Sequence, residues 1–109
     1  MPEIFTKQNY EEFYIVGDFY KDIDPSDSIV LGSSSVAAED KDEADVTATV
    51  LTAATLAVVD SSVAGADNCL TVWVKAGSET ASNYKITFKA ECVSGMKLEL
   101  DIVMKIKEE

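Results

Sequence analysis

Strict alternation of apolar and polar residues near the end of the chain constrains the fold more than any other feature. In MKLELDIVMKIK, residues 96–107, every second residue from Met96 is apolar, and the residues between are polar except Val103. A period of two over this length places the apolar side chains on one face of a strand, whereas a helix would scatter them around its axis. The segment therefore predicts a long strand with one buried and one solvated face.

The same alternation runs through the segments that come before it. NYKITFKAEC, residues 83–92, is separated from 96–107 by the short turn VSG, which predicts an antiparallel hairpin. CLTVWVKA, residues 69–76, places Leu70 and its alternate neighbours inward and Trp73 outward, and the polar linker GSETASN follows. Successive strands at such spacing indicate a sandwich or a barrel.

The first half of the chain predicts further strands with less regular patterns. They lie at residues 13–20, 28–38, 45–51 and 55–60. The first of them is aromatic and β-branched, and we expect a kink or bulge near Gly17. The Ala-rich stretch 36–57 could contain a helix instead, although threonine and valine dominate its second half.

Short strands joined by polar connections define the expected fold class. About seven of them match an all-β, immunoglobulin-like antiparallel β-sandwich. A chain of 109 residues is one domain by size. We therefore expect an N-terminal arm at residues 1–9 and a single sandwich domain at residues 10–109.

The charge and composition narrow the classes of function. The net charge is −11, all basic residues are lysine, and the chain has no His or Arg. Nucleic-acid binding needs a clustered cationic surface, so we expect no nucleic-acid partner. Without His, the usual general base and the commonest metal ligand are missing, which favours a protein that is not an enzyme and holds no cofactor.

No segment has the pattern of a membrane anchor or of a signal peptide. The start, MPEIFTKQNY, has no apolar stretch behind a basic start, and aliphatic runs such as LAVV at 56–59 are far too short to cross a bilayer. We therefore expect no membrane partner and synthesis in the cytoplasm.

Two acidic segments are candidate metal sites. Asp22, Asp24 and Asp27 in DIDPSD could supply oxygen ligands to calcium, but the glycine and distal glutamate of an EF-hand loop do not follow. AEDKDEADV, residues 38–46, lies where a hairpin connection belongs, and its consecutive acids repel one another instead of converging on one ion. We interpret both segments as solvated turns, with calcium binding at the three aspartates as the alternative.

The two cysteines are expected to be free thiols. Cys92 ends the inward face of its predicted strand, whereas Cys69 is in phase with the outward Trp73. A disulfide needs the two Cβ vectors to converge, and opposite faces argue against that. With no His or Arg in the chain to lower a thiol pKa, a nucleophilic role is not expected.

Aromatic residues gather in the first twenty residues and suggest contact surfaces. Some of them are expected to pack in the core, and the remainder to form an apolar patch that docks on a neighbouring subunit. Outward aromatics such as Trp73 also anchor interfaces. The interaction candidates are Phe5, Tyr10, Tyr14, Tyr20 and Trp73.

Three longer segments carry a family resemblance. They are YIVGDFYKDIDPSDSI at 14–29, SVAAEDKDEADVTATVL at 35–51, and the closing run LTVWVKAG…NYKITF…MKIKE at 70–108. In order, an aromatic strand leads through a polar loop to a DSI strand start, a hairpin ends in DVTATVL, and a Y-x-I-x-F strand precedes the last strand. This pattern resembles small immunoglobulin-like proteins encoded among the structural genes of tailed bacteriophages and prophages. The Trp common in the first strand of such proteins is absent here, with Tyr14 or Phe19 in its place.

The resemblance implies a virion component of the neck, the tail or the shell decoration, with no catalytic residues to carry over. The expected function is therefore that of a non-enzymatic structural protein that contacts other virion proteins or itself. The alternative is a carbohydrate- or cell-surface-binding β-sandwich module, with or without calcium. A third option, an enzyme that uses carboxylates, requires a concave pocket with two converging acids.

Overall fold

The computed structural model describes residues 3–7, 11–19, 23, 27–40, 42–59, 68–75 and 83–106. Within these residues the chain is mostly β, with one 3₁₀ turn (η1) and a single turn of α-helix (α1). The elements are β1 (Glu3–Lys7), β2 (Phe13–Asp18), η1 (Leu31–Ser33), β3 (Ser35–Glu39), α1 (Thr47–Val50), β4 (Leu51–Val59), β5 (Cys69–Val74), β6 (Asn83–Glu91) and β7 (Lys97–Ile106).

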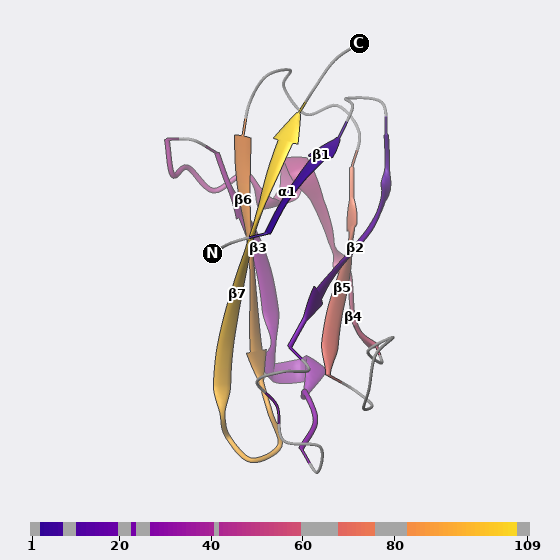
Figure 1. Ribbon diagram of the computed structural model, residues 1–109, viewed down its shortest axis with the longest axis vertical. Coiled ribbons are helices and arrows are strands. Elements are labelled where there is room, and N and C mark those ends of the chain that lie inside the picture. Colours follow the sequence, from indigo (N-terminus) through magenta and orange to yellow (C-terminus); the bar gives the residue numbers. More distant parts are fainter. Residues whose placement is uncertain are drawn as a thin grey trace.

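The strands form two sheets that face each other. One sheet has the order β1-β7-β6-β3 and the other the order β2-β5-β4. In Figure 1, β7, β6 and β3 lie on the left and β2, β5 and β4 on the right. All neighbouring strands are antiparallel except β1 and β7, which run parallel. The predicted all-β sandwich is confirmed.

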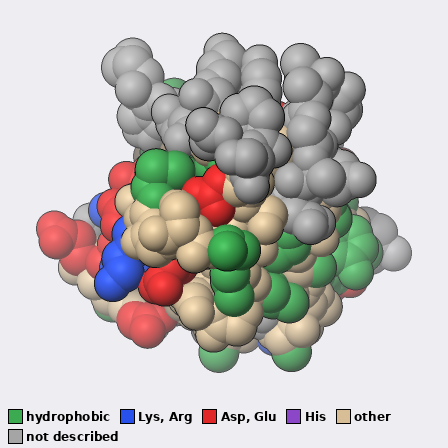
Figure 2. All heavy atoms as spheres, turned by 90° about the horizontal axis from the view of Figure 1, so that it is seen from below, with side chains coloured by type: hydrophobic (Ala, Val, Ile, Leu, Met, Phe, Trp, Pro, Cys, Tyr) green, Lys and Arg blue, Asp and Glu red, His purple; other side chains and the backbone are tan. Residues whose placement is uncertain are grey.

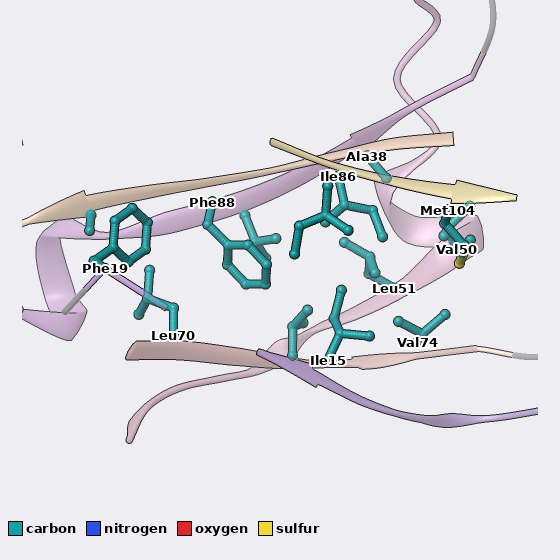
Figure 3. Close-up of a cluster of buried hydrophobic side chains, with 14 of the residues drawn as sticks. Ile15, Phe19, Ala38, Val50, Leu51, Leu70, Val74, Ile86, Phe88 and Met104 are labelled. Atoms are coloured by element: carbon teal, nitrogen blue, oxygen red, sulfur yellow. The ribbon is translucent and has the colours of Figure 1, made fainter. Parts of the chain in front are cut away.

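The core lies between the two sheets, where alternate residues of each strand point inward. Figure 3 shows Phe88 and Ile86 from one layer directed toward Leu70, Ile15 and Val74 from the other. Phe88, Ile86, Leu70 and Val74 have no exposed surface. Each such side chain contributes roughly 1.5–3 kcal/mol by leaving water, which makes this layer the main source of stability.

The predicted strands of the second half are confirmed. Buried and exposed residues alternate along β6, and β6 pairs with β7 from Asn83 opposite Lys105 to Glu91 opposite Lys97. The connecting turn places Gly95 at φ +92°, a left-handed conformation that glycine adopts without strain. The hairpin expected around VSG is therefore present.

Residues 3–7, expected as part of an N-terminal arm, instead form the edge strand β1. They pair with β7 from Glu3 opposite Ile102 to Lys7 opposite Ile106. The rings of Phe5 and Phe13 lie 6.0 Å apart edge to face, and Phe13 belongs to the other sheet. The strand at 3–7 was not predicted, because a five-residue edge strand with a partner at the far end of the chain leaves little trace in the local pattern.

The strand predicted at 45–51 is also wrong. The amide of Val46 donates to the carbonyl of Ala38 at 2.9 Å, and the amide of Ala38 donates to Oγ1 of Thr47 at 2.9 Å. These bonds turn the chain into α1, which connects one sheet to the other. The helix considered for residues 36–57 is therefore present as one turn only. Next, β4 begins at Leu51, earlier than the strand predicted at 55–60.

Two further expectations in the first half need correction. The strand predicted at 28–38 contains η1, so that only 35–39 forms β3, while Ile29 makes a single bridge to Cys92. No bulge occurs at Gly17, because β2 pairs with β5 without interruption from Phe13 to Asp18. Gly17 instead faces the ring of Phe88 across the core.

Candidate interaction face

The outer face of the four-stranded sheet is charged and internally balanced. Its strands place opposite charges directly across from one another or within ion-pair distance; the pairs are Glu39–Lys85, Lys89–Glu99 and Glu91–Lys97. Figure 2 looks along the long axis, and most of the charged side chains seen there lie on the left, the side of this sheet in Figure 1. Cross-strand pairs of opposite charge stabilise such a sheet and suit contact with water.

The ion pair on this face has a clear electrostatic effect. Lys85 Nζ lies 3.4 Å from Glu39 Oε1. The hydrogen bond and charge of Glu39, with a smaller contribution from Asp101, raise the pKa of Lys85 above its ordinary value. Both side chains are solvated, so this pair orders the surface more than it stabilises the fold.

The outer face of the three-stranded sheet presents apolar side chains instead. Tyr14 and Trp73 are direct partners on β2 and β5, and their rings lie 4.9 Å apart at 77°, edge to face. Tyr14 is 57% exposed, and Val16, two residues further on the same face of β2, is 47% exposed. We call Tyr14, Val16 and Trp73 the Tyr14–Trp73 face.

A hydrogen-bonded layer supports this face from β4 and β5. The register of β4 against β5 shifts between Thr52 and Ala57. Within that irregular stretch, Oγ1 of Thr55 accepts a bond from the amide of Trp73 at 2.9 Å and donates to the carbonyl of Thr52 at 2.6 Å. The Thr55 hydroxyl therefore replaces a missing ladder bond and fixes the backbone of Trp73.

Thr71 and Cys69, which precede Trp73 in the outward row of β5, are closed to solvent. Thr71 is buried and donates from Oγ1 to the carbonyl of Ile15 at 2.7 Å, which ties β5 to β2. Cys69 is buried in the same row, outside the main core cluster. The two strands that carry the Tyr14–Trp73 face are therefore held together by a side-chain hydrogen bond as well as by their backbone pairing.

The five interaction candidates do not come together as one patch. Tyr14 and Trp73 are adjacent, whereas Phe5 is half-buried and packs against the core. Tyr10 and Tyr20 lie outside the described residues. The sequence reasoning missed Val16, although its outward position, two residues after Tyr14, was a usable signal.

The candidate calcium ligands are only partly described. Asp22 and Asp24 lie outside the described residues. Asp27 accepts hydrogen bonds from the amide of Ser28 and from the amide and hydroxyl of Ser94, at 2.9, 3.2 and 2.5 Å. These bonds, with that from the Ser94 hydroxyl foremost, hold the pKa of Asp27 below its ordinary value. The carboxylate fastens the start of this segment to the β6–β7 turn.

In the acidic segment 38–46, Ala38 and Glu39 end β3, and the described residues that follow form the predicted turn, with residues 42–45 exposed. Oδ1 of Asp40 accepts bonds from the amides of Asp42 and Ala44, at 2.8 and 3.0 Å. Asp45 accepts from the hydroxyl and amide of Thr47, and these bonds lower the pKa of Asp45. Among the residues that the structure describes, no three His, Cys, Asp or Glu side chains gather in a geometry suited to a metal ion.

Both cysteines are free thiols, as expected from their positions on opposite faces. Cys92 belongs to the core, where burial raises the pKa of its thiol and the charge of Asp27 adds to the effect. A thiol with a raised pKa is a poor nucleophile at neutral pH, which is consistent with a packing role.

An open groove of about 390 Å³ crosses the outer ends of β6 and β7. Its acids are Glu91 and Glu99, and its other lining residues include Lys89, Lys97 and Ser33. Each of the two carboxylates faces a lysine on the neighbouring strand. The groove is therefore part of the balanced charged face rather than a pair of acids aimed at one point.

Across the described segments, no helix has the length and apolar character needed to span a membrane. Comparison of the chain with protein-family models, with curated proteins and with solved structures gives no match.

Proposed function

We propose that this chain is a non-enzymatic, immunoglobulin-like structural protein of a phage or prophage particle. It acts by protein–protein contact, and the Tyr14–Trp73 face is its contact surface. The partners are other virion proteins.

The strand order supports the immunoglobulin-like assignment. The second, fourth and fifth strands form one sheet in the order β2-β5-β4, and the last two strands join β3 in the other sheet in the order β7-β6-β3. This order agrees with that of immunoglobulin-like sandwiches, in which strands B, E and D oppose strands G, F and C, and so supports the proposal. The parallel β1 extends the second sheet beyond its last strand.

The contrast between the two outer faces carries the contact function. On the outer face of the four-stranded sheet, opposite charges lie across from one another. On the outer face of the three-stranded sheet, Tyr14 and Val16 are exposed beside Trp73. Aromatic residues on rigid elements anchor interfaces because they bury a large area at a small entropic cost. An apolar face on one side only suits a module that attaches by that side.

The phage context rests on the sequence resemblance of residues 14–29, 35–51 and 70–108. The composition agrees with it, since a chain without His or Arg is poorly equipped for general-base or phosphate chemistry. A protein that works by contact needs neither.

The test uses the single tryptophan of the chain, which lies in the proposed interface. Purified chain is mixed with each protein of the candidate particle, association is followed by Trp73 emission and by sedimentation, and the particle is imaged by cryo-microscopy. Val16→Arg should weaken association at least about tenfold, as expected for a charge placed in the centre of an interface. Lys89→Ser, on the opposite outer face, is the matched control and should leave association unchanged.

The proposal fails if the native chain associates with none of the virion proteins and is absent from the imaged particle. Association that survives Val16→Arg but is lost with Lys89→Ser would move the contact to the charged face. Binding to glycans that Tyr14→Ser abolishes would favour the carbohydrate-binding alternative instead.

A further inference from the structure

The outer edge of β2 directs backbone hydrogen-bonding groups away from the sandwich. β2 ends the order β2-β5-β4, so it has a partner strand on one side only. The amide of Phe19 donates to the carbonyl of Asn68, which lies directly opposite when the register of β2 with β5 is continued. In an antiparallel ladder, Phe19 and every second residue before it therefore bond to β5. Tyr14 and Val16 lie between those residues, so their N–H and C=O groups point toward the free edge.

The bonding of Trp73 agrees with this assignment. Trp73 lies directly opposite Tyr14, yet its amide donates to Oγ1 of Thr55 on the β4 side and not to β2. Tyr14 and Trp73 are thus a pair without backbone bonds to each other. Among the residues that the structure describes, none bonds to the outward N–H and C=O groups of Tyr14 and Val16.

The other edge strands each carry a feature that opposes pairing. The edge of β3 is capped, since Val46 and Thr47 bond to the backbone of Ala38. The register of β4 shifts in the middle of the strand, and β1 is a short strand, EIFTK, with a charged residue at either end. β2 pairs without interruption, and the centre of FYIVGD contains no charge and no proline. Because proteins use such features to prevent edge-to-edge association, β2 is the edge at which pairing is least opposed.

We propose that β2 pairs with β2 of a second copy of this chain, antiparallel about a two-fold axis at Ile15. In this register, Tyr14 of each copy lies opposite Val16 of the other, and the two residues exchange both of their outward backbone bonds. The register is self-complementary, as a two-fold dimer requires. It also places an aromatic side chain beside a β-branched side chain on the same outer face, which is a stabilising cross-strand pair.

A second copy is favoured over a strand of another protein because β2 itself supplies the matching edge. The pairing would join the three-stranded sheets of both copies into one sheet and bring two Tyr14–Trp73 faces side by side. This inference goes beyond the proposed function, since the pairing uses the edge of β2 and leaves the face open to virion proteins. The interface is small and each copy has a net charge of −11, so the dimer should be weak and should be strengthened by salt.

The amides of β2 test this pairing in the native chain. Sedimentation equilibrium is measured from about 10 µM to about 1 mM chain at moderate salt, and amide exchange is followed by NMR at both ends of that range. We expect a dimer to form as the concentration rises, and the amides of Tyr14 and Val16 to change from fast to slow exchange. The amide of Ile15 bonds to β5 within the chain and should exchange slowly throughout, so it is the internal control.

Two substitutions at one position separate the backbone bond from the side chain. Val16→Pro removes the outward N–H but none of the bonds to β5, and proline is tolerated on an edge strand. It should weaken dimerisation at least about thirtyfold, because a bond is lost from each copy. Val16→Thr keeps the amide and the β-branched shape, so it should change dimerisation less than about fivefold. Melting temperatures show whether both variants fold, and if Val16→Pro does not, amide exchange in the native chain decides alone.

The outcomes distinguish this inference from the proposed function. A chain that stays monomeric throughout, or a dimer in which the amides of Tyr14 and Val16 still exchange fast, overturns the pairing and leaves the contact function standing. Folded Val16→Pro that dimerises like the wild type does the same. Slow exchange of these amides only in the presence of a virion protein overturns the second copy as the occupant in favour of a strand of that protein. If the dimer forms as expected but associates with no virion protein, the contact function fails and the pairing stands.

Discussion

The ring of Phe88 occupies the space that a side chain on Gly17 would need. A β-carbon built on Gly17 would lie 2.8 Å from Cδ2 of Phe88, and 3.1 Å from Cδ2 of Leu100. The two residues come from opposite sheets, so this contact sets how closely β2 approaches β6. Glycine is required here for space and not for an unusual backbone conformation.

Gly17→Ala should therefore destabilise the protein, by about 1–3 kcal/mol, because an added methyl group overpacks a filled core. Urea denaturation followed by circular dichroism measures the free energy of unfolding. Gly32→Ala is the control, since a β-carbon at Gly32 has nothing within 4 Å, and it should unfold near the wild-type midpoint. Equal midpoints for Gly17→Ala and the wild type would contradict the contact.

The contact with Phe88 also predicts a coupling between the two positions. Phe88→Leu reduces the ring to a smaller side chain and should cost stability by itself. In that background Gly17→Ala should cost less than in the wild type, with a coupling of about 0.5–3 kcal/mol, the range for residues in direct contact. Additive effects of the two substitutions would show that another neighbour resists the methyl group.

Tyr14 and Trp73 form an aromatic pair on the outer face, and their contact should be measurable without any partner. A double-mutant cycle with Tyr14→Leu and Trp73→Leu should give a coupling of about 0.5–1 kcal/mol, near the lower end for aromatic pairs because Tyr14 is largely exposed. Circular dichroism is the readout, since Trp73→Leu removes the only tryptophan. Tyr14→Phe, which keeps the ring, should retain most of the coupling.

The bond between Asp27 and Ser94 predicts a dependence of stability on pH. The pKa of Asp27 in the folded state is below its ordinary value of 3.8, so the folded state prefers the charged carboxylate more than the unfolded state does. The contribution of the Asp27 carboxylate to the free energy of unfolding is therefore fully present above the pKa of the unfolded state. It is lost as the pH falls through the lower pKa of the folded state. Asp27→Asn should lower the melting temperature at about pH 6 but progressively less at pH values below about 4.

Ser94→Ala provides the matched control for that experiment. It removes the hydroxyl that accounts for the largest part of the pKa shift of Asp27. The effects of Ser94→Ala and Asp27→Asn should not add, because both break the same bond. If the difference in melting temperature between Asp27→Asn and the wild type stays constant from neutral to acidic pH, the Asp27–Ser94 bond is not the source of the pH dependence.

The two thiols should be protected in the folded protein and released together on unfolding. Both are buried, and burial raises the pKa of Cys92. A chromogenic disulfide reagent at about pH 8 should therefore react slowly with the native chain and rapidly with two thiols per chain in denaturant. Cys69→Ser and Cys92→Ser assign the two contributions, and fast labelling of Cys92 in the native state would contradict its place in the core.

The strands of the second half were predictable because their two faces meet different surroundings. Residues such as Ile86 and Met104 are buried in the sandwich while Lys85 and Lys105 lie in water, so the alternation in sequence is also an alternation in space. The hairpin needed only a short turn with a glycine that tolerates positive φ. Local pattern and tertiary structure agree there.

The first half was less predictable because tertiary contacts override its local pattern. The alternation of Val46, Ala48 and Val50 suggested a strand, but Thr47 bonds to Asp45 and to the backbone of Ala38 and turns the chain instead. Gly17 suggested a bulge because the sequence of one strand does not show that Phe88, on the opposite sheet, fills the space beside it. At the candidate site, the outward phase of Trp73 was visible in the sequence, whereas its pairing with Tyr14 depends on the register between β2 and β5.

The parallel pairing of β1 with β7 has a consequence for how the chain reaches its final form. A ribosome makes β1 long before β7, so this edge of the sheet cannot close until the last strand has emerged. Until then the edge of β6 that pairs with β7 is open, and contacts between segments as distant as β1 and β7 form slowly. During synthesis the chain should therefore pass through an incomplete sandwich that is prone to aggregate. The charged outer rows of its strands would oppose aggregation until β7 is made.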